Sequence, residues 1–163
     1  MIVYHGSTEI IKNPDVVHSK KYLDFGRGFY ITTFENQAKK WAVRKGMRQE
    51  KNAIVNVYEL SEAWDYFKVL SFEKENEKWL DFVCACRKGQ PLNKEYDIII
   101  GNVADDDVFK TVDMYFRGLW NKEKVLGELR YYKMNNQICI VNQETLNRLI
   151  TFKRAYEVEN NGR

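Results

Sequence analysis

The sequence predicts an α+β fold in a single domain. Segments with strand character and segments with helical spacing alternate irregularly along the chain. The length of 163 residues corresponds to about one domain, and 44% hydrophobic residues are enough for a packed core. With two prolines and nine glycines, a long Pro-rich linker is excluded. We expect one domain over residues 1–158 and a polar tail over residues 159–163.

Six segments have the composition of β-strands. They are short runs of β-branched, aromatic and aliphatic residues bounded by glycine or polar residues. Gly6 and Ser7 end the first run, and Gly101 ends a buried run at 96–100. The predicted strands are 2–4, 28–32, 53–60, 96–100, 137–141 and 151–158.

Five segments carry apolar residues at spacings of three and four, which is typical of amphipathic helices. Thr32 and Glu35 resemble a capping box at the start of the first, which carries Trp41 and Lys45 on one side. The third opens with acidic residues, which suit the positive end of a helix. The predicted helices begin near residue 34, near 72 (ending near 88), at 105–107 (with Val108, Val112, Tyr115 and Leu119 as its apolar stripe), at 122 (ending near 132) and after 141.

Composition also limits the classes of function. Lys and Arg number 26 and Asp and Glu 23, and a net charge of +3 does not by itself indicate a nucleic-acid binder. No apolar run approaches the roughly 20 residues of a membrane helix, and the N-terminus does not resemble a signal peptide. We therefore expect a cytoplasmic protein without membrane contact.

The cysteines indicate neither a disulfide framework nor a metal site. Their odd count argues against paired bridges. Cys84 and Cys86 are two residues apart, so on a helix their side chains diverge and cannot hold one metal ion. We expect Cys84, Cys86 and Cys139 to be buried, reduced thiols.

Polar or glycine-rich positions interrupt three of the predicted strands. His5 ends the first strand before Gly6, where a ligand can approach the backbone; a surface or core histidine is the alternative. Arg27 lies between Gly26 and Gly28, and Tyr30 follows on the strand. Such an aromatic face can stack on a flat cationic ring, or the segment is a glycine turn followed by core aromatics.

The third position is Gln137, at the start of an apolar strand. A buried glutamine needs hydrogen-bond partners; the alternative is an edge position that faces water.

Taken together, these segments resemble the ADP-ribosyltransferase superfamily, in particular the His-Tyr-Glu branch that includes diphtheria toxin and the poly(ADP-ribose) polymerases. The matching segments are residues 5–7 (His-Gly-Ser), 25–33 (Phe-Gly-x-Gly-Phe-Tyr-x-Thr-Thr) and 136–137 (Asn-Gln). Trp41 stands where that branch has a second stacking aromatic. Together with residues 100–106 (Ile-Gly-x-Val-Ala-Asp-Asp), they also resemble an uncharacterised bacterial family of the same fold.

The resemblance implies split mixed and antiparallel sheets around an NAD cleft, with NAD as co-substrate and no metal. His5 would bind the adenosine-side ribose, the Gly6 backbone the nicotinamide amide, and Tyr30 and Trp41 the two faces of the nicotinamide ring. Arg27 would either contact the pyrophosphate of NAD or be a solvated loop residue. The implied NAD-binding residues are His5, Gly6, Ser7, Arg27, Gly28, Tyr30 and Trp41, with His5, Tyr30 and Gln137 catalytic and converging on one cleft.

Gln137 departs from the family, which has glutamate at this position. Glutamine keeps a hydrogen bond to the ribose but lacks the charge and the basicity. Asp105 and Asp106 either supply a carboxylate or cap a helix.

The resemblance implies a bacterial mono-ADP-ribosyltransferase of a toxin or defence kind, with a protein or nucleic-acid acceptor and a neutralising antitoxin or immunity protein. An inactive NAD- or ADP-ribose-binding module, an NAD glycohydrolase, and a globular domain with fortuitous motifs remain alternatives.

Overall fold

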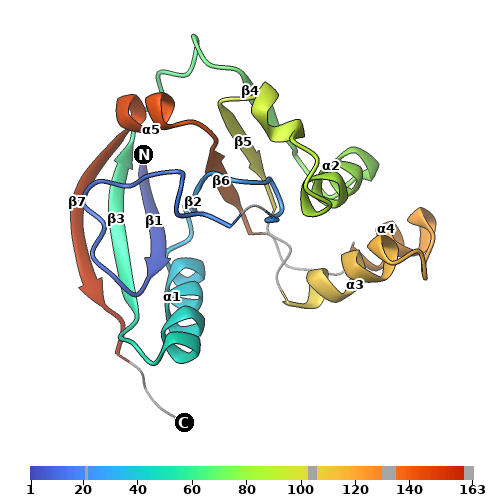
Figure 1. Cartoon of the computed structure of the whole chain (residues 1–163), viewed down its shortest axis with the longest axis horizontal. Helices are drawn as coiled ribbons and strands as arrows, with labels where there is room; N and C mark the ends of the chain where they lie inside the picture. The colour runs from blue at the N-terminus through green and yellow to red at the C-terminus, as the bar shows by residue number, and fades with distance from the viewer. Residues whose placement is uncertain (21, 103–105, 130–134, 160–163) are drawn as a thin grey trace.

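The computed structural model describes residues 1–20, 22–102, 106–129 and 135–159, without the side chains of residues 106 and 107. Within these residues the fold is α+β, with two sheets (Figure 1). The three-stranded sheet is antiparallel, with the order β1 (Ile2–Ser7), β3 (Ile54–Leu60), β7 (Ile150–Glu157). The four-stranded sheet has the order β2 (Phe29–Ile31), β6 (Gln137–Ile140), β5 (Ile98–Gly101), β4 (Val69–Ser71), and only its β4–β5 pair is parallel.

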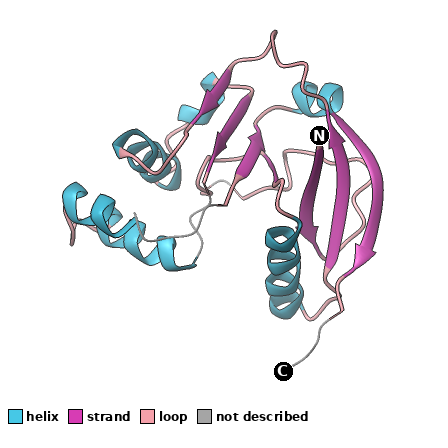
Figure 2. Cartoon of the chain, turned by 180° about the vertical axis from the view of Figure 1, so that it is seen from behind, coloured by secondary structure: helices cyan, strands magenta, loops and turns pink. Residues whose placement is uncertain are grey.

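The helices lie at separate places around the two sheets (Figure 1). α1 packs against the three-stranded sheet, whereas α2, α3 and α4 gather beside the four-stranded sheet (Figures 1 and 2). Their bounds are α1 (Glu35–Gln49), α2 (Glu77–Arg87), α3 (Asp106–Phe116), α4 (Lys122–Leu129) and α5 (Gln143–Leu149), with a 3₁₀ helix at Leu92–Glu95. In the part of the chain that is described, no helix has the length and apolarity needed to cross a membrane.

The predicted strands and helices are all present, with errors at some ends. The helix expected from residue 72 begins instead at Glu77, after Asn76, whose side chain accepts a bond from the Trp79 amide. Phe72 follows β4 and continues its hydrogen bonding to β5, because the Phe72 amide donates to the Ile100 carbonyl (2.8 Å). Leu119 was expected in the apolar stripe of α3, but it follows the end of that helix and is 63% exposed.

Two further details differ from expectation. The prediction of a Thr32–Glu35 capping box is wrong, because Phe34 is the N-cap of α1. Thr32 Oγ1 instead accepts from the Phe34 amide and donates to Asn136 Oδ1. The short edge strand β4 was missed, because three residues with two exposed side chains carry no clear alternation. The three cysteines are buried and unbridged, as the sequence predicted.

Three hydrophobic clusters hold the layers together. One lies between α1 and the three-stranded sheet and includes Ala38, Ala42 and Val55. The second lies between the two sheets, where Val3 meets Phe29. The third joins the four-stranded sheet to α2, α3 and α4.

The two sheets meet edge to edge where β1 and β2 share one bridge. Tyr4 and Thr32 exchange backbone hydrogen bonds of 2.8 and 3.0 Å. Residues opposite each other at such a bridge point to the same face. We call this junction of residues 4–6 with residues 30–32 the seam. One face of it therefore carries Tyr4, Gly6, Thr32 and Tyr30. His5 points to the other face, where its ring stacks on Phe29.

Gly6 allows the close approach of β1 to α1. A Cβ at this position would overlap the Ala38 carbonyl oxygen and lie 2.7 Å from the Ala42 amide nitrogen. These are backbone atoms of a packed helix, so they cannot move aside cheaply.

We therefore expect Gly6→Ala to lower the free energy of unfolding by about 1–3 kcal/mol or more, through overpacking. Urea denaturation followed by circular dichroism measures this change. Gly127→Ala in α4 is the control, because a Cβ there meets nothing within 4 Å, and it should stabilise the helix by about 0.5–1 kcal/mol. Equal stability of Gly6→Ala and the wild type would contradict the close packing of β1 on α1.

Candidate functional site

The three sequence motifs come together at the seam between the sheets. His5 Nδ1 lies 2.7 Å from the carbonyl oxygen of Tyr30. Thr32 Oγ1 donates to Asn136 Oδ1 (2.9 Å), although the two residues are 104 positions apart. The seam therefore joins the end of β1, the strand β2 and the residue before β6.

The His5 ring has a defined tautomer. A carbonyl oxygen only accepts, so His5 Nδ1 carries a proton and donates to Tyr30. Burial lowers the pKa of His5 to about 4, Lys45 adds to this effect, and the hydrogen bond to Tyr30 opposes it. The ring is thus neutral at pH 7, and Nε2 keeps a lone pair that accepts a hydrogen bond.

Among the described residues, the pairing of β1 with the end of β2 stops at the Tyr4–Thr32 bridge, and we call the stretch beyond it, at Gly6 and Tyr30, the gap. Met1 and Leu60 exchange bonds of 2.8 Å at the start of the β1–β3 ladder. Bonded and non-bonded pairs alternate along such a ladder, so Tyr4 and Gly6 point their N–H and C=O groups away from β3. Tyr4 uses them for Thr32. Gly6 comes next on that side, opposite Tyr30, where the described pairing of β1 with β2 has ended.

Tyr30 lies on the same face as Gly6 but is held by its own loop. Its hydroxyl donates to the Gly26 carbonyl (2.6 Å) and accepts from the Phe25 amide (3.0 Å). Burial, together with Cys139 and Asp24, raises the pKa of Tyr30 well above its usual value. The ring packs against the cluster under α2, so it has a clear structural role in addition to any binding role.

Trp41 belongs to a stripe of α1 that faces the seam. Gln37, Trp41 and Lys45 follow one another at intervals of four, and all three are half-buried. Gln37 Nε2 donates to the Asn136 carbonyl (2.7 Å), which fixes the stripe against the start of β6. Trp41 lines an open hollow of about 630 Å³ together with Gly6, Arg44, Lys45, Met47 and Arg48.

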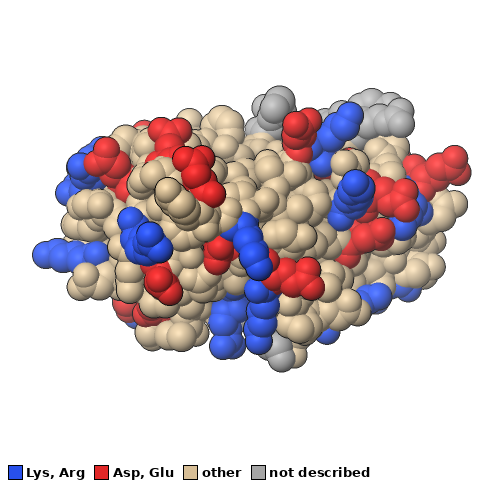
Figure 3. Space-filling view, turned by 90° about the horizontal axis from the view of Figure 1, so that it is seen from above, with Lys and Arg blue, Asp and Glu red and all other residues tan. Residues whose placement is uncertain are grey.

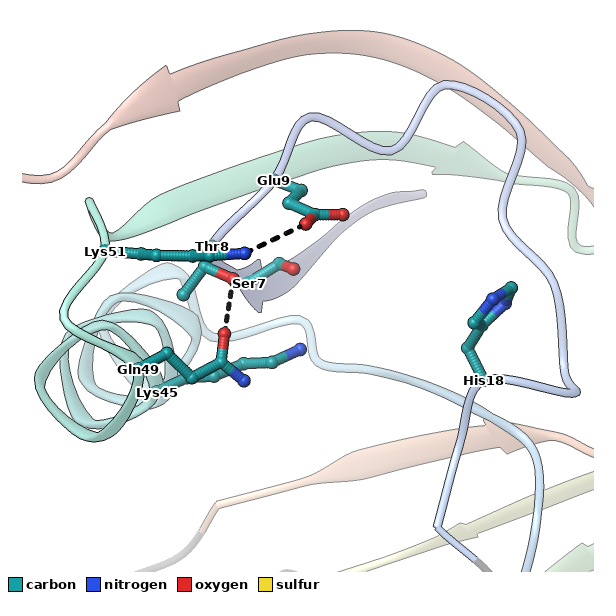
Figure 4. A pocket seen from close by; sticks show the side chains of 7 residues that line it. All are labelled: Ser7, Thr8, Glu9, His18, Lys45, Gln49 and Lys51. Atoms are coloured by element: carbon teal, nitrogen blue, oxygen red, sulfur yellow. Dashed lines mark hydrogen bonds and ion pairs between the residues drawn. The ribbon is translucent and has the colours of Figure 1, made fainter.

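Ser7 lines a neighbouring hollow of about 560 Å³ (Figure 4). Its other lining residues are Thr8, Glu9, His18, Lys45, Gln49 and Lys51. Lys45 is common to both hollows, whereas Tyr30 and Gln137 line neither of them. Gly6, Ser7 and Trp41 thus line these hollows, with Gly6 and Ser7 themselves buried and Trp41 half-buried.

Gln137 is buried, with 4% exposure, in a strand between two others, so the alternative of a water-facing edge position is wrong. It lies on the face of Tyr30, since Cys139, two residues on, is opposite Tyr30. Gln137 Nε2 donates to Asp24 Oδ2 (3.1 Å) and to the Asn102 carbonyl (3.3 Å).

These two partners fix the orientation of the Gln137 amide. Ionised Asp24 and the Asn102 carbonyl can only accept, so the NH₂ group must face both of them. Asp24 is itself held by Arg87, whose Nη2 lies 2.5 Å from Oδ1. The Gln137 Oε1 atom, which can accept a hydrogen bond, therefore points away from Asp24.

The remaining predicted site residues either line neither hollow or lie outside the described residues. Arg27 is exposed and lines neither hollow, and its carbonyl accepts from Asn93 Nδ2 (3.0 Å). Gly28 permits close packing, because a Cβ there would lie 2.8 Å from the Ile140 carbonyl oxygen. Asp105 and the side chain of Asp106 lie outside the described residues.

Sequence reasoning did not assign roles to Asp24, Arg87 or Lys45. The spacing of Trp41 and Lys45 already placed both on one helix side, which was a usable signal. No sequence signal links Asp24 to Arg87 and Gln137, because these pairs are 63 and 113 positions apart.

The neutral, buried state of His5 predicts a pH dependence of stability. Because its folded pKa of about 4 is below the ordinary 6.5, the unfolded chain takes up the proton first as the pH falls. The free energy of unfolding should therefore decrease between pH 6.5 and 4, by up to about 3 kcal/mol. Denaturant titrations across this interval measure the slope.

His5→Gln should flatten that slope, because its amide donates to the Tyr30 carbonyl without titrating. His18→Gln is the control, since the His18 side chain is 86% exposed, and it should retain the slope. Identical slopes for His5→Gln and the wild type would show that His5 titrates alike in both states.

Comparison with curated proteins gives no match. A family model matches residues 1–152, which include the seam, α1 and both hollows. The chain belongs to the family described as "protein of unknown function (DUF3990)".

Proposed function

We propose that this protein is an NAD-dependent ADP-ribosyltransferase that transfers single ADP-ribose units to a macromolecule. The observation that carries the proposal is the gap at Gly6, bordered by the three motifs. Gly6 offers one N–H donor and one C=O acceptor side by side. A primary carboxamide such as that of nicotinamide needs one acceptor and one donor in the same way.

The neighbouring groups suit the rest of the nicotinamide riboside. Tyr30 lies opposite Gly6 on the same face, and Trp41 on α1 lines the hollow beside it. Aromatic rings on either side of a cationic nicotinamide ring would stabilise it through the ring quadrupole. His5 borders the gap from the other face of the seam, and its Nε2 can accept from a ribose hydroxyl.

The proposed reaction breaks the bond between nicotinamide and ribose. Nicotinamide leaves with the bonding electron pair, and the ribosyl carbon becomes an oxocarbenium-like centre. A nucleophilic group of the acceptor forms the new bond to this carbon and loses its proton to water. Gln137 Oε1 would accept a hydrogen bond from the ribose 2′-hydroxyl. Without a charge, Gln137 stabilises the developing cation less than a carboxylate does and cannot deprotonate an acceptor. We therefore propose transfer of single ADP-ribose units and not the growth of an ADP-ribose chain.

NAD labelled at the adenylate phosphate tests this function. After incubation with cell lysate, the label is separated into protein, nucleic acid and small molecules. Label on protein or nucleic acid supports transfer, and free ADP-ribose indicates a glycohydrolase instead. Unchanged NAD in the presence of measurable NAD binding would favour an inactive binding module, the alternative suggested by the neutral Gln137.

Trp41 provides a test of nicotinamide binding that leaves the core intact. Trp41→Ala should weaken NAD binding by about 1–2 kcal/mol, through loss of the aromatic face. Calorimetric titration with NAD measures this, under conditions where nicotinamide release is negligible. Met47→Ala is the matched control, because Met47 lines the same hollow and is 70% exposed. Equal affinities for Trp41→Ala and the wild type would remove Trp41 from the NAD site.

The Asp24–Gln137 contact predicts how a glutamate would behave at position 137. Gln137→Glu places a carboxylate against Asp24 and the Asn102 carbonyl. The like charges raise the pKa of the introduced group, so stability relative to the wild type should fall by about 2–4 kcal/mol at pH 7. That difference should shrink as the pH falls toward 4, since protonation removes the repulsion.

The Asp24→Asn/Gln137→Glu double variant exchanges the acid and the amide. Asn at position 24 removes the like charge and can donate to the new carboxylate, but Arg87 loses its partner, so stability should recover only in part relative to Gln137→Glu. Nicotinamide release should then equal or exceed that of the wild type, because the charge stands nearer to the reacting sugar. Gln137→Glu as stable as the wild type would contradict the amide orientation, and a folded, NAD-binding double variant without nicotinamide release would contradict the catalytic role of position 137.

A further inference from the structure

Lys45 is a half-buried cation at the junction of the two hollows. It lines both of them, and within the described residues no acidic side chain forms an ion pair with it. Burial is the main cause that lowers the pKa of Lys45, so the ammonium group has lost part of its hydration. A buried charge of this kind is stabilised by an anion.

The surroundings of Lys45 are predominantly cationic. Arg48 and Lys51 lower its pKa further, as does Lys20, whereas Glu9 opposes them. Glu9 already lies 3.4 Å from Lys51 Nζ, in an exposed pair. The protein therefore leaves an excess of positive charge around Lys45.

Polar groups without charge complete the hollow. In Figure 4 the Lys45 ammonium points into open space between α1 and the loop that carries His18, with Ser7 at the end of β1 above it. Thr8 and Gln49 close one side and are bonded to each other (2.9 Å). The hollow thus combines Lys45 with hydroxyl and amide groups, and the carboxylate in its lining, Glu9, is paired with Lys51. This arrangement is suitable for phosphoryl oxygens.

We propose that Lys45 is the centre of a subsite for the diphosphate of a dinucleotide. Trp41 and Lys45 are one helical turn apart on α1, about 6 Å along the axis. A ring on Trp41 and a phosphoryl group on Lys45 would leave room for one ribose between them. That the dinucleotide is NAD rests on the proposed function, whereas the phosphoryl subsite does not.

This assignment places the diphosphate at Lys45 rather than at Arg27, whose exposed side chain lines neither hollow. A nucleic-acid backbone is the other source of phosphoryl groups. Backbone recognition uses a row of exposed cations. Arg48 and Lys51 are exposed near Lys45, but the half-buried Lys45 lies one helical turn from the Trp41 ring, which favours a dinucleotide. On the face shown in Figure 3, Lys and Arg are interspersed with Asp and Glu.

Calorimetry with inorganic pyrophosphate and with ADP-ribose tests the subsite on the full-length protein. Lys45→Met should weaken binding of both ligands by about ten- to a hundredfold, through loss of a charge-assisted contact. Lys40→Met is the control, because Lys40 is exposed on the same helix and lines neither hollow, and it should bind both ligands like the wild type. Lys45→Arg should retain part of the affinity because it keeps the charge.

Nicotinamide release from NAD by the same variants separates the subsite from the proposed reaction. If the wild type binds ADP-ribose in a Lys45-dependent manner but releases no nicotinamide, the subsite stands and the reaction fails. If the wild type cleaves NAD while Lys45→Met keeps the wild-type KM and ADP-ribose affinity, the subsite is overturned. Lys45-dependent binding of a single-stranded oligonucleotide without binding of pyrophosphate or ADP-ribose would also overturn it, in favour of nucleic acid.

Discussion

The backbone bridge between Tyr4 and Thr32 is the constraint on which the candidate site depends. It joins the edge of one sheet to the edge of the other through two hydrogen bonds. The Thr32 hydroxyl extends the junction to Asn136, and the Asn136 carbonyl extends it to Gln37 on α1. Three segments that are distant in sequence, around residues 4, 32–37 and 136, are thereby held in one place, so a change in the bridge would be transmitted to the proposed contacts with a dinucleotide.

The described backbone pairing between the two sheets consists of this one bridge, and that limit also matters for the site. A longer ladder would pair Gly6 with Tyr30 and consume their backbone groups. Instead His5 binds the Tyr30 carbonyl with its side chain, and α1 presses against Gly6 from the adjoining face. The His5 side chain thus takes the Tyr30 carbonyl that the next rung would use, and the described pairing of the two strands ends there.

A second chain of contacts determines what Gln137 can do. Arg87 holds one oxygen of Asp24, and the other oxygen accepts from the Gln137 amide. Since a glutamine side chain has a donor end and an acceptor end, fixing one end directs the other. The neighbouring carboxylate thus favours an amide at position 137 and disfavours a second acid, which gives a physical reason for glutamine in a buried strand.

The sequence by itself determined most of the helices and strands, apart from the short edge strand β4 and the ends of some elements. Apolar spacing placed Trp41 and Lys45 on one helix side, and β-branched runs located the longer strands. Gly6 was expected to admit a ligand, whereas its role in packing β1 against α1 came from the structure. Only the tertiary structure decided which polar groups meet: the pairing of Asp24 with Arg87 and Gln137, the single bridge at Thr32, and the lack of an ion-pair partner for Lys45 among the described residues. Periodicity reports the local face of an element, whereas these contacts depend on the order of strands in two sheets, and no spacing along the chain encodes that order.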